Sequence, residues 1–164
     1  MAITLDEIKK IVRSAAYMVG VDQNDPNIIK YGQFFTPNQE AIDAVNAMFA
    51  LDPIVFTDPE KTVIDPVGCG SGDLLLEVMI KKMENGSTHE QALKTLYGVD
   101  IDQKNVDLCR KRLLCGEEHL RPIVERNIVC ADALKYQYRF DSSDPYKTDQ
   151  DLHLERLFSE SETL

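Results

Sequence analysis

The sequence has no long apolar run and no secretory signal. A membrane-spanning helix needs about 20 consecutive apolar residues, and no stretch of the 164 residues has this character. The N-terminal sequence MAITLDEIKKIVRS also lacks the apolar block and the small-residue cleavage site of a signal peptide. We therefore expect a cytoplasmic protein that makes no contact with a membrane.

Cysteine pairs are also missing. The cysteines lie at positions 69, 109, 115 and 130, and no two of them form a Cys-x-x-Cys motif. Such motifs are typical of zinc sites, so we expect no metal site. The spacing does not indicate a disulfide framework either, which favours a reducing compartment.

Positive charge is scarce. The chain has 18 Lys and Arg against 28 Asp and Glu, a formal net charge of −10 at pH 7. A protein that holds DNA by its phosphates usually presents a basic face. The basic clusters at 9–10 and 110–112 lie in predicted helices among acids, where a solvated helix face is the simplest interpretation. DNA remains a possible partner, though not through a basic surface.

The patterns that are present indicate a single α/β domain. The chain is long enough to bury a core, and its hydrophobic fraction of 43% is ordinary. Short apolar runs alternate with helical periodicity, which predicts parallel strands joined by right-handed crossovers. We expect N-terminal helices in residues 1–50, a ligand-binding half in residues 60–140 and a tail in residues 141–164.

Caps, periodicity and turn residues set the expected boundaries. Helices are predicted from a capping box at Thr4 to near Gly20, from Thr36 onward, and over 73–84, 88–94 and 103–115. Strands are predicted over 63–64, 95–100 and 127–130, with 136–140 as a possible fourth. We expect loops at 21–32 and 52–59, and one or two helical turns at 151–158.

Three glycines follow the first predicted strand. Gly68, Gly70 and Gly72 alternate in TVIDPVGCGSGDLL, residues 62–75, directly before a predicted helix. In open parallel sheets a ligand binds beyond the carboxyl ends of the strands. Glycine removes the Cβ that would block a ligand, and the helix N-terminus offers unpaired N–H groups. A tight strand-to-helix turn would also explain these glycines by themselves.

Acidic residues close the next two predicted strands. Asp100 is placed to accept hydrogen bonds from a ribose diol, and Ile101 could cover one face of a base. Asp132, or the neighbouring backbone at Ala133, could meet an exocyclic amine. Asp102 could serve the ligand or cap the next helix. Glycines and acids at three successive strand ends together indicate a ligand that contains a nucleoside.

The usual nucleotide fingerprints are absent. The glycines alternate strictly, so the Gly-x-Gly-x-x-Gly pattern of dinucleotide sites is missing. The P-loop lysine is missing too, and Asp73 in its place would repel a triphosphate. S-adenosylmethionine fits better, because it joins an adenosine to a zwitterionic amino-acid tail and carries no phosphate.

Four segments together resemble a known family. They are GQFFTP at 32–37, DPVGCGSGDLL at 65–75, YGVDID at 97–102 and IVCADAL at 128–134. In order and spacing they resemble the cofactor half of the adenine-N6 DNA methyltransferases with a Thr-Pro motif before the glycine loop, such as the modification subunits of type I restriction-modification systems. The resemblance covers residues 30–135 and implies a partial Rossmann-like class I methyltransferase sheet of three to four parallel strands.

The resemblance implies a role for each matching residue. Asp100 would hold the ribose hydroxyls, Ile101 would pack on the adenine, and Asp132 with Ala133 would read its amino group. The residues that would border or line the methionine end are Phe35, Thr36, Pro37, Asp65, Gly70 and Gly72, with Gly68 of the same loop as a further candidate.

A helix start is the alternative explanation of the Thr-Pro motif. Thr36 would then be the N-cap, Pro37 the first helical residue and Gln39 the back-capping partner.

The sequence departs from the family pattern in two places. Gly68 makes the glycine loop one residue longer than the usual Asp-Pro-x-Cys-Gly-x-Gly, which leaves the placement of Asp65 open. The family's catalytic Asn/Asp-Pro-Pro-Tyr/Phe motif, whose ring stacks on a flipped base, has no full counterpart. The nearest segment is SDPY, so Asp144, Pro145 and Tyr146 are the candidate catalytic residues. An ordinary Asp-Pro turn is the alternative.

Two functions remain open from the sequence. The first is a minimal S-adenosylmethionine-dependent methyltransferase of the adenine-N6 type. The alternative is a non-catalytic cofactor-binding or regulatory module that completes, mimics or inhibits another methyltransferase. The expected strand order 3-2-1-4 is half of the usual sheet and leaves a bare edge strand, which invites pairing. We therefore expect a homodimer or a complex with a larger methyltransferase-like protein.

Overall fold

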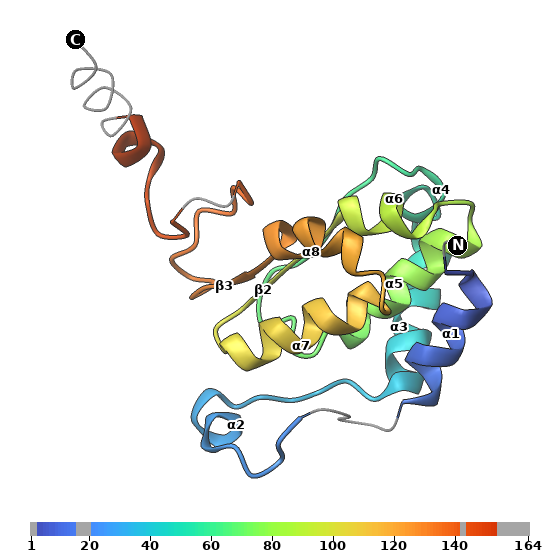
Figure 1. Cartoon of the computed structure of the whole chain (residues 1–164), viewed down its shortest axis with the longest axis horizontal. Coiled ribbons are helices and arrows are strands. Elements are labelled where there is room, and N and C mark those ends of the chain that lie inside the picture. The colour runs from blue at the N-terminus through green and yellow to red at the C-terminus, as the bar shows by residue number, and fades with distance from the viewer. Residues whose placement is uncertain (1–2, 16–20, 142–143, 154–164) are drawn as a thin grey trace.

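A computed structural model describes residues 3–15, 21–141 and 144–153, and shows a three-stranded sheet packed against helices (Figure 1). The helices are α1 (Leu5–Ser14), α2 (Pro26–Tyr31), α3 (Asn38–Leu51), α4 (Ile54–Thr57), α5 (Asp73–Glu84), α6 (His89–Lys94), α7 (Gln103–Leu114) and α8 (Arg121–Asn127), with a 3-10 turn at Glu118–Leu120. The strands are β1 (Val63–Asp65), β2 (Leu96–Asp100) and β3 (Ile128–Cys130). The predicted class, a partial Rossmann-like α/β sheet with an N-terminal helical segment, is confirmed.

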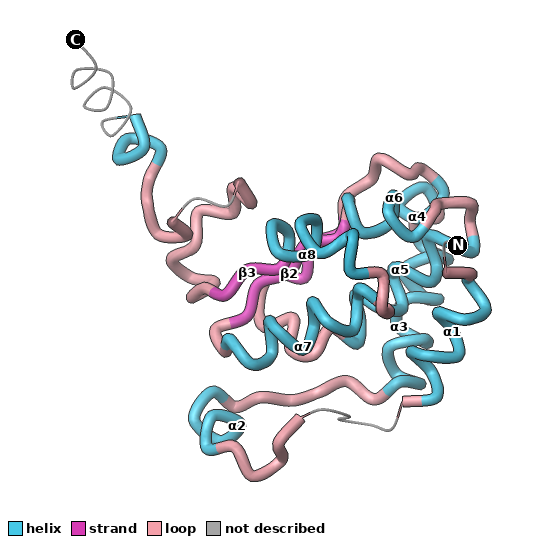
Figure 2. Tube along the Cα trace, viewed as in Figure 1, coloured by secondary structure: helices cyan, strands magenta, loops and turns pink. Residues whose placement is uncertain are grey.

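The strands are parallel and follow the chain order β1-β2-β3 across the sheet, and Figure 2 shows β2 and β3 side by side. Val63 lies opposite Leu96, and Gly98 lies opposite Ile128. Because each strand is added on the same side of the previous one, right-handed crossovers place α5 and α7 on the same face. The sheet therefore has one helical face, and all three strands end at the same edge.

The helical face holds the main hydrophobic core. α5 lies at its centre and contacts α1, α3, α6 and α7 as well as β1 and β2. Every residue from Leu75 to Ile80 is buried, as expected for a helix surrounded by other elements. This run includes Glu77, whose carboxylate is 2.7 Å from a guanidinium nitrogen of Arg13 on α1. The ion pair compensates the buried charge and fixes α1 to the core.

An aromatic cluster, not a fourth strand, covers the other face of the sheet. Residues 136–140, predicted as a possible strand, pair with no strand among the described residues. Tyr138 and Phe140 have φ angles of 53° and 51°, which interrupt an extended conformation. Their rings and that of Tyr136 pack instead around Val99 on β2.

The first two helices differ from the prediction. α1 ends at Ser14, because Ala15 is already extended, and so it does not continue to Gly20 (residues 16–20 lie outside the described residues). Residues 21–32 are not only a loop. They contain α2, which begins after the N-cap Asp25 and ends at Gly32 in the left-handed conformation.

The start of α3 also differs from the prediction. The helix begins at Asn38, since Pro37 is extended and is itself the N-cap, without a side-chain hydrogen bond. Thr36 is therefore not the N-cap. Gln39 does not cap the helix backbone either, and its amide donates instead to Asp43 at 2.8 Å.

Three further segments complete the comparison. The predicted loop at 52–59 contains α4, and α8 fills the interval before β3. At the other end of the chain, residues 149–153 are helical, and the remainder of the expected helix at 151–158 lies outside the described residues. Among the residues described, no helix is both long and apolar enough to cross a lipid bilayer.

The β1 edge of the sheet is open. In the described ranges β1 pairs with β2 alone, so its other edge carries unpaired backbone groups. Ile64 in the middle of β1 is 45% exposed. A groove of about 340 Å³ runs beside it, and its lining includes the basic side chains of Arg126 and Arg139.

Candidate cofactor site

A pocket of about 580 Å³ opens at the carboxyl ends of the strands. We refer to it as the larger pocket. The long loop between α2 and α3, seen in Figure 2, contributes to one side, and the segments after β1, β2 and β3 form the rest. The predicted site residues in its lining are Phe35, Gly68, Gly70, Asp100, Ile101, Asp132 and Ala133.

Positive backbone angles shape the glycine loop. Gly68 and Gly70 have φ angles of 79° and 55°, which other residues adopt only at a cost. The N–H groups of Gly68 and Cys69 both donate to the carbonyl of Val99, at 3.0 and 2.9 Å, so the loop folds back over the end of β2. A Cβ at Gly68 would lie 3.9 Å from the carboxylate of Asp100. Gly68, the additional residue of the loop, therefore lies beside Asp100, the central acid of the larger pocket.

Asp100 is that central acid, and it is only 5% exposed. Its Oδ1 accepts hydrogen bonds from the N–H of Asp102 at 2.8 Å and from Asn105 Nδ2 at 3.3 Å. Its Oδ2 accepts one from the N–H of Gly70 at 2.8 Å. A carboxylate has about four acceptor positions, so one remains on Oδ2. Asp100 can therefore accept a further hydrogen bond from a hydroxyl in the larger pocket.

A smaller pocket of about 190 Å³ adjoins the larger one, because Phe34, Phe35, Val67, Gly68 and Gly70 line both. The smaller pocket adds Asp65 and Thr36 to this shared lining.

Asp65 is one of two acids in the lining of the smaller pocket, and the other, Asp73, pairs with Arg112. Burial, together with a lesser effect of the Asp100 carboxylate, raises the pKa of Asp65 above its usual value of 3.8. No basic side chain among the described residues pairs with it. The smaller pocket therefore offers an uncompensated acid to a ligand cation.

Two phenylalanines of the α2–α3 loop have different surroundings. Phe35 is 8% exposed and packs on the glycine loop, where a Cβ at Gly70 would lie 3.7 Å from its ring. Phe34 is 96% exposed at the junction of the two pockets. Pro37, the N-cap of α3, does not line either pocket.

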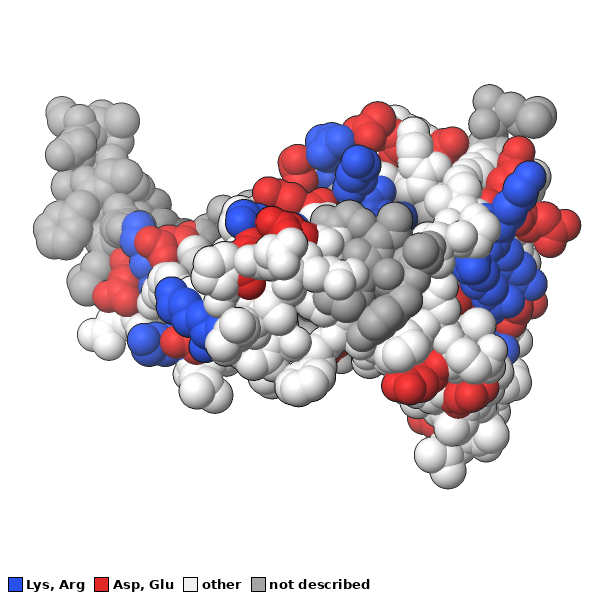
Figure 3. Space-filling view, turned by 90° about the horizontal axis from the view of Figure 1, so that it is seen from below, with Lys and Arg blue, Asp and Glu red and all other residues white. Residues whose placement is uncertain are grey.

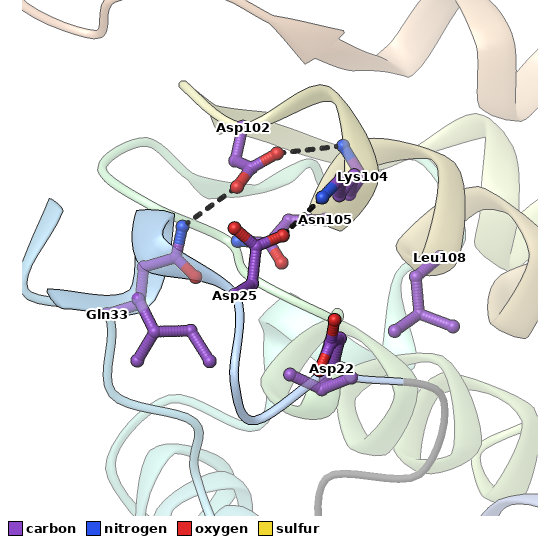
Figure 4. Close-up of a pocket in the computed structure, with 9 residues that line it drawn as sticks. Asp22, Asp25, Gln33, Asp102, Lys104, Asn105 and Leu108 are labelled. Carbon is purple, nitrogen blue, oxygen red and sulfur yellow. Dashed lines mark hydrogen bonds and ion pairs between the residues drawn. The ribbon is translucent and has the colours of Figure 1, made fainter. Parts of the chain in front are cut away.

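Asp102 caps α7 and borders a separate cavity of about 230 Å³ (Figure 4). Its Oδ1 accepts a hydrogen bond from the N–H of Lys104 at 3.0 Å, and its Oδ2 accepts one from Gln33 Nε2 at 3.2 Å. The Lys104 ammonium pairs in turn with Asp25 at the start of α2. These contacts hold the α2 region beside α7, and the cap interpretation of Asp102 is confirmed.

Residues of α7 support the glycine loop from behind. Arg112 donates to the carbonyl of Ser71 and pairs with Asp73, both at 2.9 Å. Gly72 packs on Cys109, because a Cβ at Gly72 would lie only 2.6 Å from the Cys109 sulfur. Gly72 thus serves helix packing and does not line either pocket. Sequence reasoning missed the support by Arg112, since nothing in the spacing connects residues 73 and 112.

Most of the chain, residues 15–143, matches the family model described as N-6 DNA Methylase. The chain belongs to the N-6 DNA methylase family. The family match confirms the resemblance stated above and makes the protein methyltransferase-like. Neither the curated proteins nor the solved structures gave a match to the chain.

Asp144, Pro145 and Tyr146 of the SDPY segment of this N-6 DNA methylase family member lie near the segment after β3, and Ser143 lies outside the described residues. The phenol oxygen of Tyr146 accepts a hydrogen bond from the N–H of Asp132 at 2.9 Å. The N–H of Tyr146 itself donates to Asp144 Oδ1 at 2.9 Å, which closes a local turn. Tyr146 is therefore next to a pocket residue, although Asp144, Pro145 and Tyr146 do not line either pocket.

Charges of both signs are mixed on the surface of this family member. Figure 3 shows acidic and basic side chains next to one another on one face, with a group of basic side chains at its right that has acidic side chains beside it. This distribution agrees with the net charge of −10.

Proposed function

We propose that the protein binds S-adenosylmethionine at the glycine-loop end of the sheet and acts as a methyltransferase of the adenine-N6 type. The main support is Asp100, a buried acid in the lining of the larger pocket with one acceptor position left on Oδ2. A ribose hydroxyl suits such an acceptor, because hydrogen bonds to a buried carboxylate are strong.

The two pockets suit the two ends of this cofactor. The larger pocket offers Ile101, 47% exposed, as a surface for the adenine, and Asp132 at its amino group. The smaller pocket offers Asp65 to the ammonium of the amino-acid tail. Because both pockets share Gly68 and Gly70, one molecule can occupy both. When bound, the cofactor would supply an electrophilic methyl group on its sulfonium.

A non-catalytic cofactor-binding or regulatory module is the second candidate. It is favoured by the turn at Asp144, whose carboxylate accepts from its own backbone at Tyr146. A polar side chain used in this way is less available to a substrate amine. In this version the protein completes, mimics or inhibits another methyltransferase, while the cofactor site is the same.

Calorimetric titration with S-adenosylhomocysteine is the first test of the cofactor site. No binding to the folded protein would exclude both versions. Transfer of a labelled methyl group to unmethylated DNA then separates them. Transfer that is lost in Tyr146→Ala supports the enzyme, whereas cofactor binding without transfer to any nucleic acid supports the module.

The open edge of β1 supports a partner. We propose a homodimer or a complex with a larger methyltransferase-like protein that covers this edge, since bare edge strands readily pair. Light scattering that shows a strict monomer at high concentration, with no partner captured, would contradict this. The buried or half-buried free thiols at 69, 109, 115 and 130 support a location in the reducing cytoplasm.

The affinity for S-adenosylhomocysteine is expected to fall as the pH is lowered. The ligand ammonium would pair with Asp65 only in its charged form, and burial raises the pKa of Asp65. Binding therefore favours release of the Asp65 proton. The contribution of the ion pair between the ammonium and Asp65 to the affinity is complete above this raised pKa and is lost as the pH falls through it. Calorimetry across the acidic range from neutral pH down to the unfolding limit would measure this dependence.

Two controls isolate the role of Asp65. Asp65→Asn should weaken binding at neutral pH and remove most of the pH dependence. 5′-Methylthioadenosine, which lacks the amino-acid tail, should show little pH dependence with the unaltered protein. An equal pH dependence for both ligands would contradict the assignment of the smaller pocket to the ammonium.

A further inference from the structure

We propose that Tyr138 is a positioning residue that sets the spacing between two walls of the cofactor pocket. The first wall is the glycine loop, residues 66–70, and the second is the segment after β3, residues 131–134. The proposal rests on the proposed cofactor site, and it concerns a side chain outside the lining of either pocket.

The Tyr138 hydroxyl reaches the backbone of both walls. Its oxygen lies 2.9 Å from the carbonyl oxygen of Pro66 and 3.0 Å from that of Ala133. The hydroxyl has one proton, so it donates to one carbonyl at a time or is shared between them. Because β2 lies between β1 and β3, the sheet does not join these two loops directly. The Tyr138 side chain provides that connection.

The backbone at Tyr138 is held in an unusual conformation. Its φ angle is 53°, in the left-handed region that costs energy for any residue with a Cβ. The ring packs on its neighbours in the cluster, with centroids 4.9 Å from Tyr136 and 6.3 Å from Phe140. Phe140 packs in turn on Tyr97 of β2 at 4.7 Å. The strained residue is therefore fixed against the sheet, as is common where a backbone serves a site.

Tyr146 strengthens the second wall from the same chain segment. Its phenol oxygen accepts from the N–H of Asp132, and the carbonyl of Pro145 accepts from the N–H of Gln137 at 3.3 Å. Arg139 adds a hydrogen bond to the carbonyl of Asp144 at 3.2 Å. The described residues of this segment, 137–141 and 144–146, therefore meet the second wall at two points, through the Tyr138 and Tyr146 hydroxyls.

The spacing matters for a ligand that contacts both walls. In the proposed mode the adenine lies against the second wall and the amino-acid tail against the glycine loop. S-adenosylhomocysteine would use both walls, whereas 5′-methylthioadenosine would leave the smaller pocket empty. A change in spacing should therefore weaken the first ligand more than the second.

Tyr138→Phe removes only the hydroxyl and keeps the ring. We expect it to weaken S-adenosylhomocysteine about threefold to tenfold, the range for one neutral hydrogen bond, and 5′-methylthioadenosine less than twofold. Tyr136→Phe is the matched control, because the hydrogen bond seen for the Tyr136 hydroxyl in the described part of the chain is one that it accepts from the N–H of Phe140 in its own segment, at 3.0 Å. It should leave both affinities within twofold of the unaltered protein.

Hydrogen exchange of the full chain supplies a second measurement that needs no ligand. Amides in residues 67–70 and 131–134 should exchange faster in Tyr138→Phe than in Tyr136→Phe at matched thermal stability. Equal ligand affinities and equal exchange in the two variants would overturn the proposal. If the unaltered protein binds neither ligand, the proposed cofactor site fails, while the exchange comparison still decides whether Tyr138 joins the two walls.

Discussion

Replacing Gly72 with alanine is expected to lower the free energy of unfolding by roughly 2–5 kcal/mol. Two effects add. Gly72 has a φ angle of 85°, which residues with a Cβ adopt only with strain. The new Cβ would also lie 2.6 Å from the sulfur of Cys109, and 3.4 Å from its Cβ, so either the Cys109 side chain or the α5–α7 contact must shift. Denaturant unfolding followed by circular dichroism measures the change.

Two variants separate strain from crowding at Gly72. Gly86→Ala has the same backbone problem, with a φ angle of 103°, but no atom within 4 Å of the new Cβ, so it should cost only the strain. In protein that already carries Cys109→Ala, the Gly72→Ala substitution should lower the free energy of unfolding by less than it does in the unaltered protein, because the sulfur is gone. Equal losses in Gly72→Ala and Gly86→Ala would contradict the contact with Cys109.

The Asp100→Asn variant is expected to bind S-adenosylhomocysteine at least ~30-fold more weakly, about 2 kcal/mol for one hydrogen bond to a charged group. The amide keeps the shape of the side chain but replaces one acceptor oxygen with a donor. That nitrogen would face either the N–H of Gly70 or the N–H of Asp102, both 2.8 Å from the carboxylate. On the Oδ2 side the amide would remove the hydrogen bond to Gly70 and the acceptor for the ligand hydroxyl together, and on the Oδ1 side it would remove the hydrogen bond to Asp102 that fixes the side chain. Calorimetry measures the affinity.

Asp102→Asn is the matched control, because it lies two residues further on and caps α7 without lining either cofactor pocket. It should leave the affinity of the folded protein within about threefold, since Asn caps a helix about as well as Asp and residue 102 lines neither cofactor pocket. Wild-type affinity in Asp100→Asn would show that the ribose is bound elsewhere. A loss as large in Asp102→Asn would show that the effect is only structural.

The part of the site formed by strand ends could be predicted from the sequence. Consecutive parallel strands end at the same edge, so Gly68, Asp100 and Asp132 had to lie near one another once the strands were recognised. All three line the larger pocket. Gly72 is in the same motif, yet it packs on α7, because a glycine pattern does not distinguish room for a ligand from room for a neighbouring helix.

The remaining parts depend on contacts that no local pattern contains. The alternation in YQYRF indicates a strand, but Tyr138 and Phe140 take left-handed angles and pack on the exposed face of the sheet. The hydroxyl of Tyr138 reaches Pro66, 72 residues earlier in the chain. α2 is a different case, because its cap signals are local. Asp25-Pro26 and Gly32 are recognisable helix-cap signals, but the polar composition of the segment led to the prediction of a loop.

The placement of α5 and α7 on one side of the sheet gives the molecule two regions of unequal local stability. Opening the helical side exposes the main core and so requires nearly global unfolding, whereas the other side is held by three aromatic rings and a few hydrogen bonds. The described part of this segment, residues 136–141 and 144–146, should therefore open more often than the helical side. A ligand held against the segment after β3 would suppress this opening, and would protect amides that it never touches.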